Sequence, residues 1–153
     1  MESAPLHDIG KVGIADNILL EPGRLTLPEF EVMKQRAWFG YEILQDSSSK
    51  VLQAGAAIVL APHEKFGGSG YPSGLKGDEI PIFGCIVAVA DIFDALTAAR
   101  AYKPGWPLAV TAEHIRAQSG THFDPECATA FLPIGMTYLT FGCTFRIKTN
   151  NTG

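Results

Sequence analysis

The chain has 153 residues, of which 46% are hydrophobic and 18% are charged, a composition typical of one folded domain rather than of a disordered segment. Its formal net charge of −4 argues against a general binder of nucleic-acid polymers, which is normally basic. The longest apolar stretch, residues 80–96, is interrupted by Asp91 and Asp94. It therefore predicts a buried helix and no membrane span.

The cysteines of the chain indicate a reducing compartment. Cys85, Cys127 and Cys143 are odd in number and lack the spacing of a metal site. We expect buried thiols, as in cytoplasmic proteins. The first residues also lack the basic and apolar regions of a signal peptide, so the expected location is the cytoplasm.

Local signals predict a succession of helices. Thr26 is placed as an N-cap, Pro28 lies in the first turn, and Glu29 can close a capping box. Apolar residues then recur at three-to-four spacing as far as Leu44, which predicts one buried stripe. Loops are expected over residues 12–25 and 66–77. Further helices are expected over about 50–60, 81–100 and 108–118, and after the N-cap Asp124, so the predicted fold class is all-α.

The last twenty residues follow a different pattern. From residue 137 to residue 148, apolar side chains alternate with polar ones. The apolar set is Leu139, Phe141, Cys143, Phe145 and Ile147. Because a period of two is typical of a β-strand, the prediction is a helical domain over 1–132 followed by an atypical tail over 133–153 with strand character.

A His-Asp pair near the start of the chain is the strongest chemical signal. His7 and Asp8 supply one nitrogen and one carboxylate ligand from a single turn, which suits a hard divalent metal that activates water. Asp91 lies within an apolar helix, where a carboxylate needs a metal, a cation or a strong hydrogen bond to compensate its burial. Alone, a surface His-Asp pair carries no meaning, so the inference depends on the other motifs.

Four short motifs occur in a fixed order: His7-Asp8 within residues 6–11, His63-Glu64 with Gly70-Tyr71-Pro72, the segment 90–96, and the basic-aromatic segment 100–104. Their order and spacing resemble the HD-GYP family of metal-dependent phosphodiesterases that hydrolyse cyclic di-GMP. The resemblance covers roughly residues 4–131. It implies an HD-domain helical bundle, here without the helices that precede the His-Asp pair, so we expect this chain to be a truncated form of a longer protein.

The resemblance also implies a role for individual residues. The implied metal ligands are His7, Asp8, His63 and Asp91. The implied substrate-binding residues are Lys11, Arg36, Gly70, Tyr71, Pro72, Arg100 and Lys103. Asp8 and Lys11 are the implied catalytic residues, with Lys11 facing the scissile phosphate. Plainer interpretations stay open: a solvated lysine, a glycine-rich turn that only packs two helices, and cations that only favour a helix C-terminus.

The chain departs from the family pattern at two ligand positions. Pro62 and Arg36 stand where the family has histidines, and the upstream ligands have no counterpart. Arginine stays protonated and cannot ligate a metal, although it can occupy the electrostatic place of a metal or bind phosphate through its fork. We therefore expect about one Mn, Fe or Ni ion per chain rather than a cluster, and weak catalysis.

The predicted function is that of a weakened HD-GYP phosphodiesterase domain acting on or binding a cyclic dinucleotide. One alternative is a non-catalytic module that binds a cyclic dinucleotide or a partner protein through the Gly-Tyr-Pro loop. Another is a different HD-superfamily hydrolase acting on a nucleotide. The expected partners are a cyclic dinucleotide, a signalling protein at the Gly-Tyr-Pro loop and further copies of the chain, with no nucleic-acid polymer and no membrane.

Overall fold

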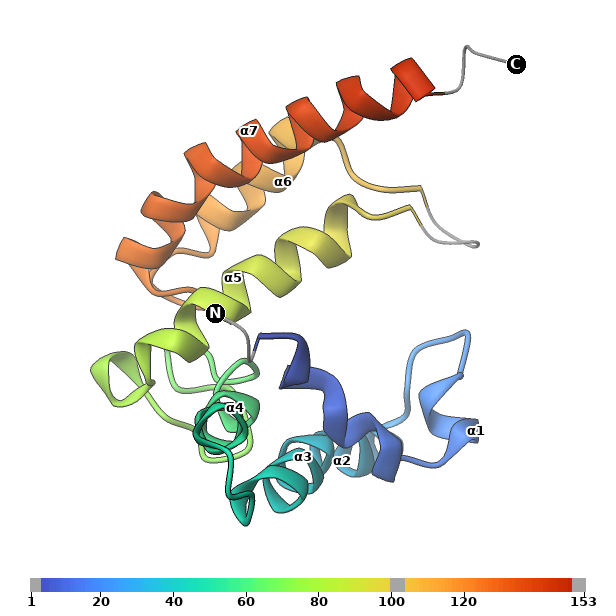
Figure 1. Cartoon of the computed structure of the whole chain (residues 1–153), viewed down its shortest axis with the longest axis vertical. Helices are drawn as coiled ribbons and strands as arrows, with labels where there is room; N and C mark the ends of the chain where they lie inside the picture. Colours follow the sequence, from blue (N-terminus) through green and yellow to red (C-terminus); the bar gives the residue numbers. More distant parts are fainter. Residues whose placement is uncertain (1–3, 100–103, 150–153) are drawn as a thin grey trace. The chain divides into compact units, whose positions relative to one another are not determined.

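The computed structural model describes residues 4–99 and 104–149, and they form helices joined by loops (Figure 1). The elements are η1 (Ala4–Gly13), α1 (Asp16–Leu19), α2 (Leu27–Lys34), α3 (Arg36–Gln45), α4 (Lys50–Leu60), η2 (Gly77–Glu79), α5 (Ile82–Thr97), α6 (Leu108–Ala117) and α7 (Pro125–Thr149). The chain divides into two compact units, Met1–Ala88 and Val89–Gly153.

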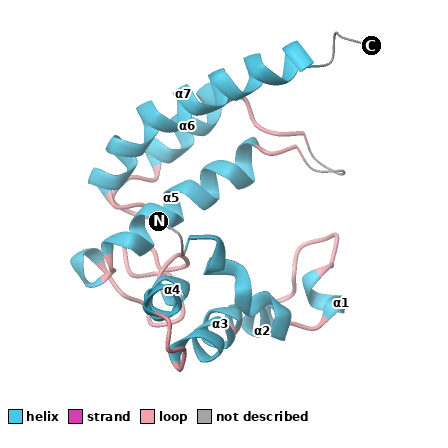
Figure 2. Ribbon diagram, viewed as in Figure 1, coloured by secondary structure: helices cyan, strands magenta, loops and turns pink. Residues whose placement is uncertain are grey.

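The all-α prediction is confirmed, because no strand occurs among the described residues (Figure 2). The predicted strand character of the tail is wrong. α7 runs to Thr149 and includes the whole alternating segment up to that residue. A single strand needs a neighbour for its backbone hydrogen bonds, whereas a helix satisfies them within its own segment. None of the described segments offers such a neighbour, and the helix that begins at Pro125 simply continues.

Helix ends with local chemical signals lie near the predicted positions. The Glu29 carboxylate accepts hydrogen bonds from the backbone amide and the hydroxyl of Thr26, at 2.8 and 2.7 Å, and so closes the capping box at α2. The Asp124 carboxylate accepts a hydrogen bond from the amide of Cys127 at 2.7 Å, which caps α7. The expected single helix after Thr26 is divided at Gln35, so Arg36 begins a new helix, α3.

The first unit is built around α3. η1, drawn in dark blue in Figure 1, packs on α3 and α4, and α3 packs on both η1 and α4. Leu44, Ala56 and Val59 form its buried core, and Ile9 of η1 packs against them. A Cβ atom added at Gly10 would lie 1.8 Å from the carbonyl oxygen of Arg36. This close approach requires glycine, and it places the His-Asp segment against the start of α3.

The second unit contains the last part of α5 together with α6 and α7. Phe93 of α5 meets Phe131 of α7 edge to face, with ring centroids 5.2 Å apart. Ile115 of α6 and Phe123 are fully buried. Across the described residues, no helix is long and apolar enough to cross a membrane.

Candidate functional site

The His-Asp motif forms a small ion-pair group on η1. Lys11 Nζ donates to Asp8 Oδ2 at 2.6 Å, and His7 Nε2 lies 3.4 Å from the same oxygen. The side chains of Asp8 and Lys11 are both about one third exposed. Lys11 thus lies beside the motif, and the carboxylate of Asp8 lies between two nitrogen groups.

A second group joins three segments that are far apart in the sequence. Arg36 Nη2 donates to the hydroxyl oxygen of Tyr71 at 2.7 Å and lies 3.5 Å from His63 Nδ1. The rings of His63 and Tyr71 are stacked, with centroids 5.0 Å apart and planes inclined by 24°. We call Arg36, His63 and Tyr71 the arginine cluster. It unites one predicted metal ligand with two predicted substrate-binding residues.

The fold positions each member of the arginine cluster. Arg36 is the first residue of α3, beside η1, and His63 lies three residues after Leu60, the last residue of α4. The amide of Tyr71 donates to the carbonyl of His63 at 3.1 Å, which brings the glycine-rich loop back to the end of α4. The edge of Phe30 on α2 contacts the Tyr71 ring at a centroid distance of 6.0 Å. Phe30 belongs to the apolar stripe that the sequence predicts to be buried, yet it is 40% exposed and contacts this site.

The charges of Asp8, in the His-Asp motif, and of Arg36, in the arginine cluster, both influence the pKa of Tyr71. Burial raises the pKa of the Tyr71 phenol above its ordinary value, the guanidinium of Arg36 opposes that rise, and the carboxylate of Asp8 adds to it. Asp8 therefore lies within electrostatic range of Tyr71. The His-Asp motif and the Gly-Tyr-Pro motif belong to one region of the first unit.

Glu64 anchors the loop that carries Tyr71. It is 2% exposed, and its carboxylate accepts hydrogen bonds from the amides of Ser73, Gly74 and Leu75, at 2.7, 3.2 and 3.1 Å. Sequence reasoning missed this role. The signal was available, because a glycine-rich loop has many backbone donors and Glu64 is the acidic residue beside it.

Several amides of the glycine-rich loop donate hydrogen bonds within the protein. The amide of Gly68 donates to the carbonyl of Lys65 at 2.7 Å, and the Tyr71 amide is used as described above. The peptide bond before Pro72 is cis, and a Cβ atom at Gly70 would lie 2.4 Å from the Cα of Glu64. In this conformation the amides of Gly68 and Tyr71 are therefore used within the protein. The side chain of Tyr71 remains the chemical group that the loop presents.

The remaining predicted residues are distributed differently. Asp91 lies on α5 in the second unit, whereas His7, Asp8 and His63 lie in the first. Arg100 and Lys103 lie outside the described residues. The four-ligand set stays a prediction.

Metal fit can be tested on the described residues. They contain no group of three or more His, Cys, Asp or Glu side chains close enough to hold a metal ion. His63 Nδ1 faces the cation of Arg36, and Asp8 is paired with Lys11. As arranged in the first unit, these side chains do not fit a three-ligand metal site.

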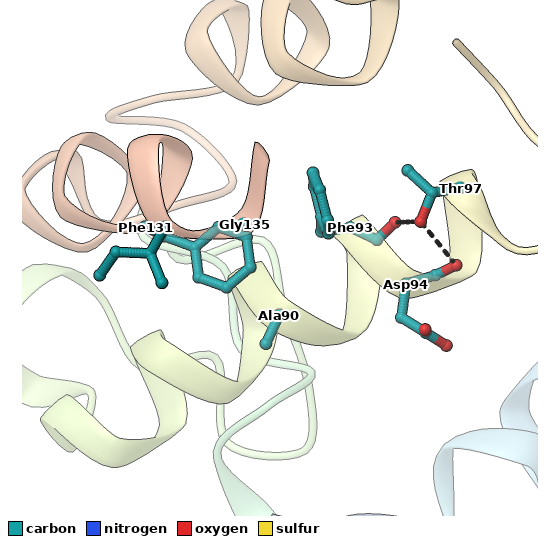
Figure 3. A pocket seen from close by; sticks show the side chains of 7 residues that line it. Ala90, Phe93, Asp94, Thr97, Phe131 and Gly135 are labelled. Atoms are coloured by element: carbon teal, nitrogen blue, oxygen red, sulfur yellow. Dashed lines mark hydrogen bonds between the residues drawn. The ribbon is translucent and has the colours of Figure 1, made fainter. Parts of the chain in front are cut away.

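The second unit has an open pocket of about 250 Å³ between α5 and α7 (Figure 3). Its lining residues are Ala90, Phe93, Asp94, Thr97, Phe131, Ile134 and Gly135. The hydroxyl of Thr97 donates to the carbonyl of Phe93 at 2.7 Å, within α5 itself (Figure 3). Because the lining is mainly apolar and Asp94 is its single ionisable residue, the arginine cluster is the stronger candidate for chemistry.

The chain is similar to known proteins over most of its length. Residues 2–127 match a family model described as HD domain. The chain is 54% identical over 132 residues to a cyclic di-GMP phosphodiesterase of Thermotoga maritima, covering 86% of this chain and 36% of that protein. It is 50% identical over 130 residues to the cyclic di-GMP phosphodiesterase response regulator RpfG of Xanthomonas campestris, covering 85% and 34%. It is 45% identical over 130 residues to the 3'3'-cGAMP-specific phosphodiesterase 2 of Vibrio cholerae, covering 85% and 25%. The chain thus spans about a third of the length of the first two relatives and a quarter of the third.

Proposed function

As its four ordered motifs predict, the chain belongs to the HD domain family, and we propose that it is an HD-GYP phosphodiesterase domain that binds cyclic di-GMP and hydrolyses it slowly. The observation that carries the proposal is the contact between motifs. Arg36 donates to Tyr71 of the Gly-Tyr-Pro motif, Tyr71 stacks on His63, and the charge of Asp8 acts on the same phenol.

The proposed roles follow from charge. Lys11 and Arg36 are cations that stabilise negative charge developing on a phosphodiester, and Tyr71 contacts the ligand with its ring or hydroxyl. Gly70 and Pro72 hold Tyr71 in place. Arg100 and Lys103 are proposed to bind the second phosphate or a guanine.

The family is metal-dependent, and a bound divalent ion of the Mn, Fe or Ni type would supply an acidified water. We propose at most about one such ion per chain. Its candidate ligands are His7, Asp8, His63 and Asp91. Because the first unit does not gather three ligands and His63 faces Arg36, hydrolysis is expected to be slow.

Product analysis of cyclic di-GMP with added Mn or Fe tests this function. We expect slow formation of linear products that is abolished in Asp8→Asn, because this change removes the negative charge of the motif. Asp78→Asn, a change of the same kind at an exposed residue, is the control. Equal turnover in Asp8→Asn and in the control would refute the role of the His-Asp motif.

A non-catalytic binding module is the second candidate. Arg36, in a position where the family has a histidine, favours it, because arginine binds phosphate but does not ligate a metal. Binding of cyclic di-GMP without turnover under any metal would select this function. A substrate panel that includes 3'3'-cGAMP and ordinary nucleotides tests the third candidate, an HD-superfamily nucleotide hydrolase.

The proposed partners also include proteins. A signalling protein is proposed to dock near the Gly-Tyr-Pro loop, and the chain is proposed to form a homo-oligomer in the cytoplasm. Trp38 and Ile43 on α3, and Ile82 and Phe83 at the start of α5, are each about half exposed, which supports association. Light scattering at micromolar concentrations is expected to give at least a dimer, and a monodisperse monomer would contradict it.

A further inference from the structure

The guanidinium of Arg36 has donors that the described residues do not use. Its Nη2 donates to the hydroxyl of Tyr71, while its buried Nε has no hydrogen-bond partner within residues 4–99 and 104–149. No carboxylate in that part of the chain forms an ion pair with it. A partly buried charge in this condition is costly, because the charge has no carboxylate beside it and the buried Nε–H has no acceptor among the described residues. A bound ligand with anionic oxygens would relieve this cost.

The contact between Arg36 and His63 turns one nitrogen of the imidazole toward a cation. Arg36 is always protonated and can only donate, so the Nδ1 atom that faces it at 3.5 Å must present its lone pair. A metal ligand needs a lone pair at the coordinating nitrogen, and in this arrangement the Nδ1 atom of His63 faces a cation. This atom therefore serves the contact with Arg36 in the structure described here.

Charge and hydrogen-bond geometry favour an anion. Asp8 and Lys11 form an ion pair at 2.6 Å, and their charges offset each other. The positive charge of Arg36 therefore has no compensating carboxylate among these side chains. The Tyr71 hydroxyl accepts from Arg36, so its own proton can be donated to an anionic oxygen. A phosphodiester has one negative charge on two free oxygens, which matches the planar fork of a guanidinium.

We propose that the arginine cluster is a metal-independent binding site for one phosphodiester group of a cyclic dinucleotide, with Arg36 occupying the electrostatic place of a metal ion. This inference rests on the proposed function, since it concerns the same ligand. It adds to the proposed function that the ligand binds even when no divalent ion is present, whereas hydrolysis needs one.

Titration calorimetry of the full chain with cyclic di-GMP in excess EDTA tests the inference. Wild type is expected to bind, and Arg36→Gln is expected to weaken binding by about 10- to 100-fold, as for the loss of a hydrogen bond to a charged group. Arg116→Gln is the matched control, because Arg116 is an exposed arginine of α6 that pairs only loosely with Glu113 at 3.6 Å. It should bind as wild type does.

A conservative variant and the metal-loaded protein separate the outcomes. Arg36→Lys keeps the charge without the fork and should bind between wild type and Arg36→Gln. It also replaces Arg36→Gln if thermal melting shows that variant unfolded. Wild-type binding with Mn but none in EDTA would overturn the inference and leave the proposed function standing, and so would an Arg36→Gln affinity equal to wild type. No binding of cyclic di-GMP with or without Mn would overturn both.

Discussion

Glu64 and Arg36 are two charged side chains of the first unit that the fold treats differently. The carboxylate of Glu64 is buried and accepts hydrogen bonds from three backbone amides of the loop. Arg36 contacts the Tyr71 hydroxyl at 2.7 Å and His63 Nδ1 at 3.5 Å, and its Nε is buried without a partner among the described residues. A buried charge stabilises a fold only where hydrogen bonds replace the lost water. The comparison separates a charge that serves the structure of the loop from one that is left for a ligand.

The largest expected effect is a loss of stability in Glu64→Ala. The change leaves three amides without their acceptor, and a hydrogen bond to a charged group contributes about 1.5–3 kcal/mol. Ser73 and Gly74 are exposed and their amides can turn to water, so we expect a loss of roughly 3 kcal/mol in the free energy of unfolding, allowing for that relief. Urea denaturation followed by circular dichroism measures it. Glu113→Ala, which removes an exposed carboxylate, should change stability by less than about 0.5 kcal/mol.

The double variant Arg36→His with Pro62→His tests whether the arginine cluster can be turned back toward a metal site. One imidazole would replace the cation of Arg36, and the other would replace Pro62, whose side chain has no metal-coordinating atom. Metal affinity and turnover should therefore rise together. We expect a rise of about tenfold or more, since even indirect supports of a metal ligand are worth 10–100-fold. Elemental analysis after dialysis and product analysis measure the two. More bound metal with no gain in hydrolysis would contradict the view that these ligands limit catalysis.

Arg36→Met is expected to change stability much less than Glu64→Ala. The variant loses one hydrogen bond to a neutral acceptor, worth about 1 kcal/mol, and it also removes a partly buried charge, so the net change in unfolding free energy should stay below about 1 kcal/mol. Binding of cyclic di-GMP should fall at the same time. If Arg36→Met unfolds as readily as Glu64→Ala, the distinction between a structural and a binding charge is wrong.

The smallest expected effect concerns Glu29, an exposed carboxylate that also accepts a backbone amide. Hydrogen bonds from the hydroxyl and the amide of Thr26 lower the pKa of Glu29. A lowered pKa in the folded state means that the stabilisation is present above the ordinary pKa and is lost as the pH falls through the lowered value. Thr26→Ala removes the hydroxyl and should raise this pKa toward its ordinary value, as an NMR titration would measure. An unchanged pKa would show that the hydroxyl bond is not made in solution.

Local chemistry made several elements predictable. The capping residues Thr26, Glu29 and Asp124 act within a few residues of the backbone groups that they satisfy, so their sequence positions were sufficient. The alternating tail shows the limit of such patterns. Its period of two predicts a strand, but a strand depends on a partner elsewhere in the chain, and none of the described segments provides one.

By itself, the sequence determined the all-α class, the family and the identity of the polar motifs, because each depends on residue types and spacings that can be read along the chain. Only the tertiary structure decided which motif residues meet. Packing of η1 on α3 at Gly10 and the return of the loop to His63 bring Arg36, His63 and Tyr71 together across 35 residues of sequence. The tertiary structure also decided that the acceptors of Glu64 are used by loop amides, whereas the Nε of Arg36 has no partner among the described residues. Hydrogen-bond satisfaction depends on neighbours in space, which the sequence does not display.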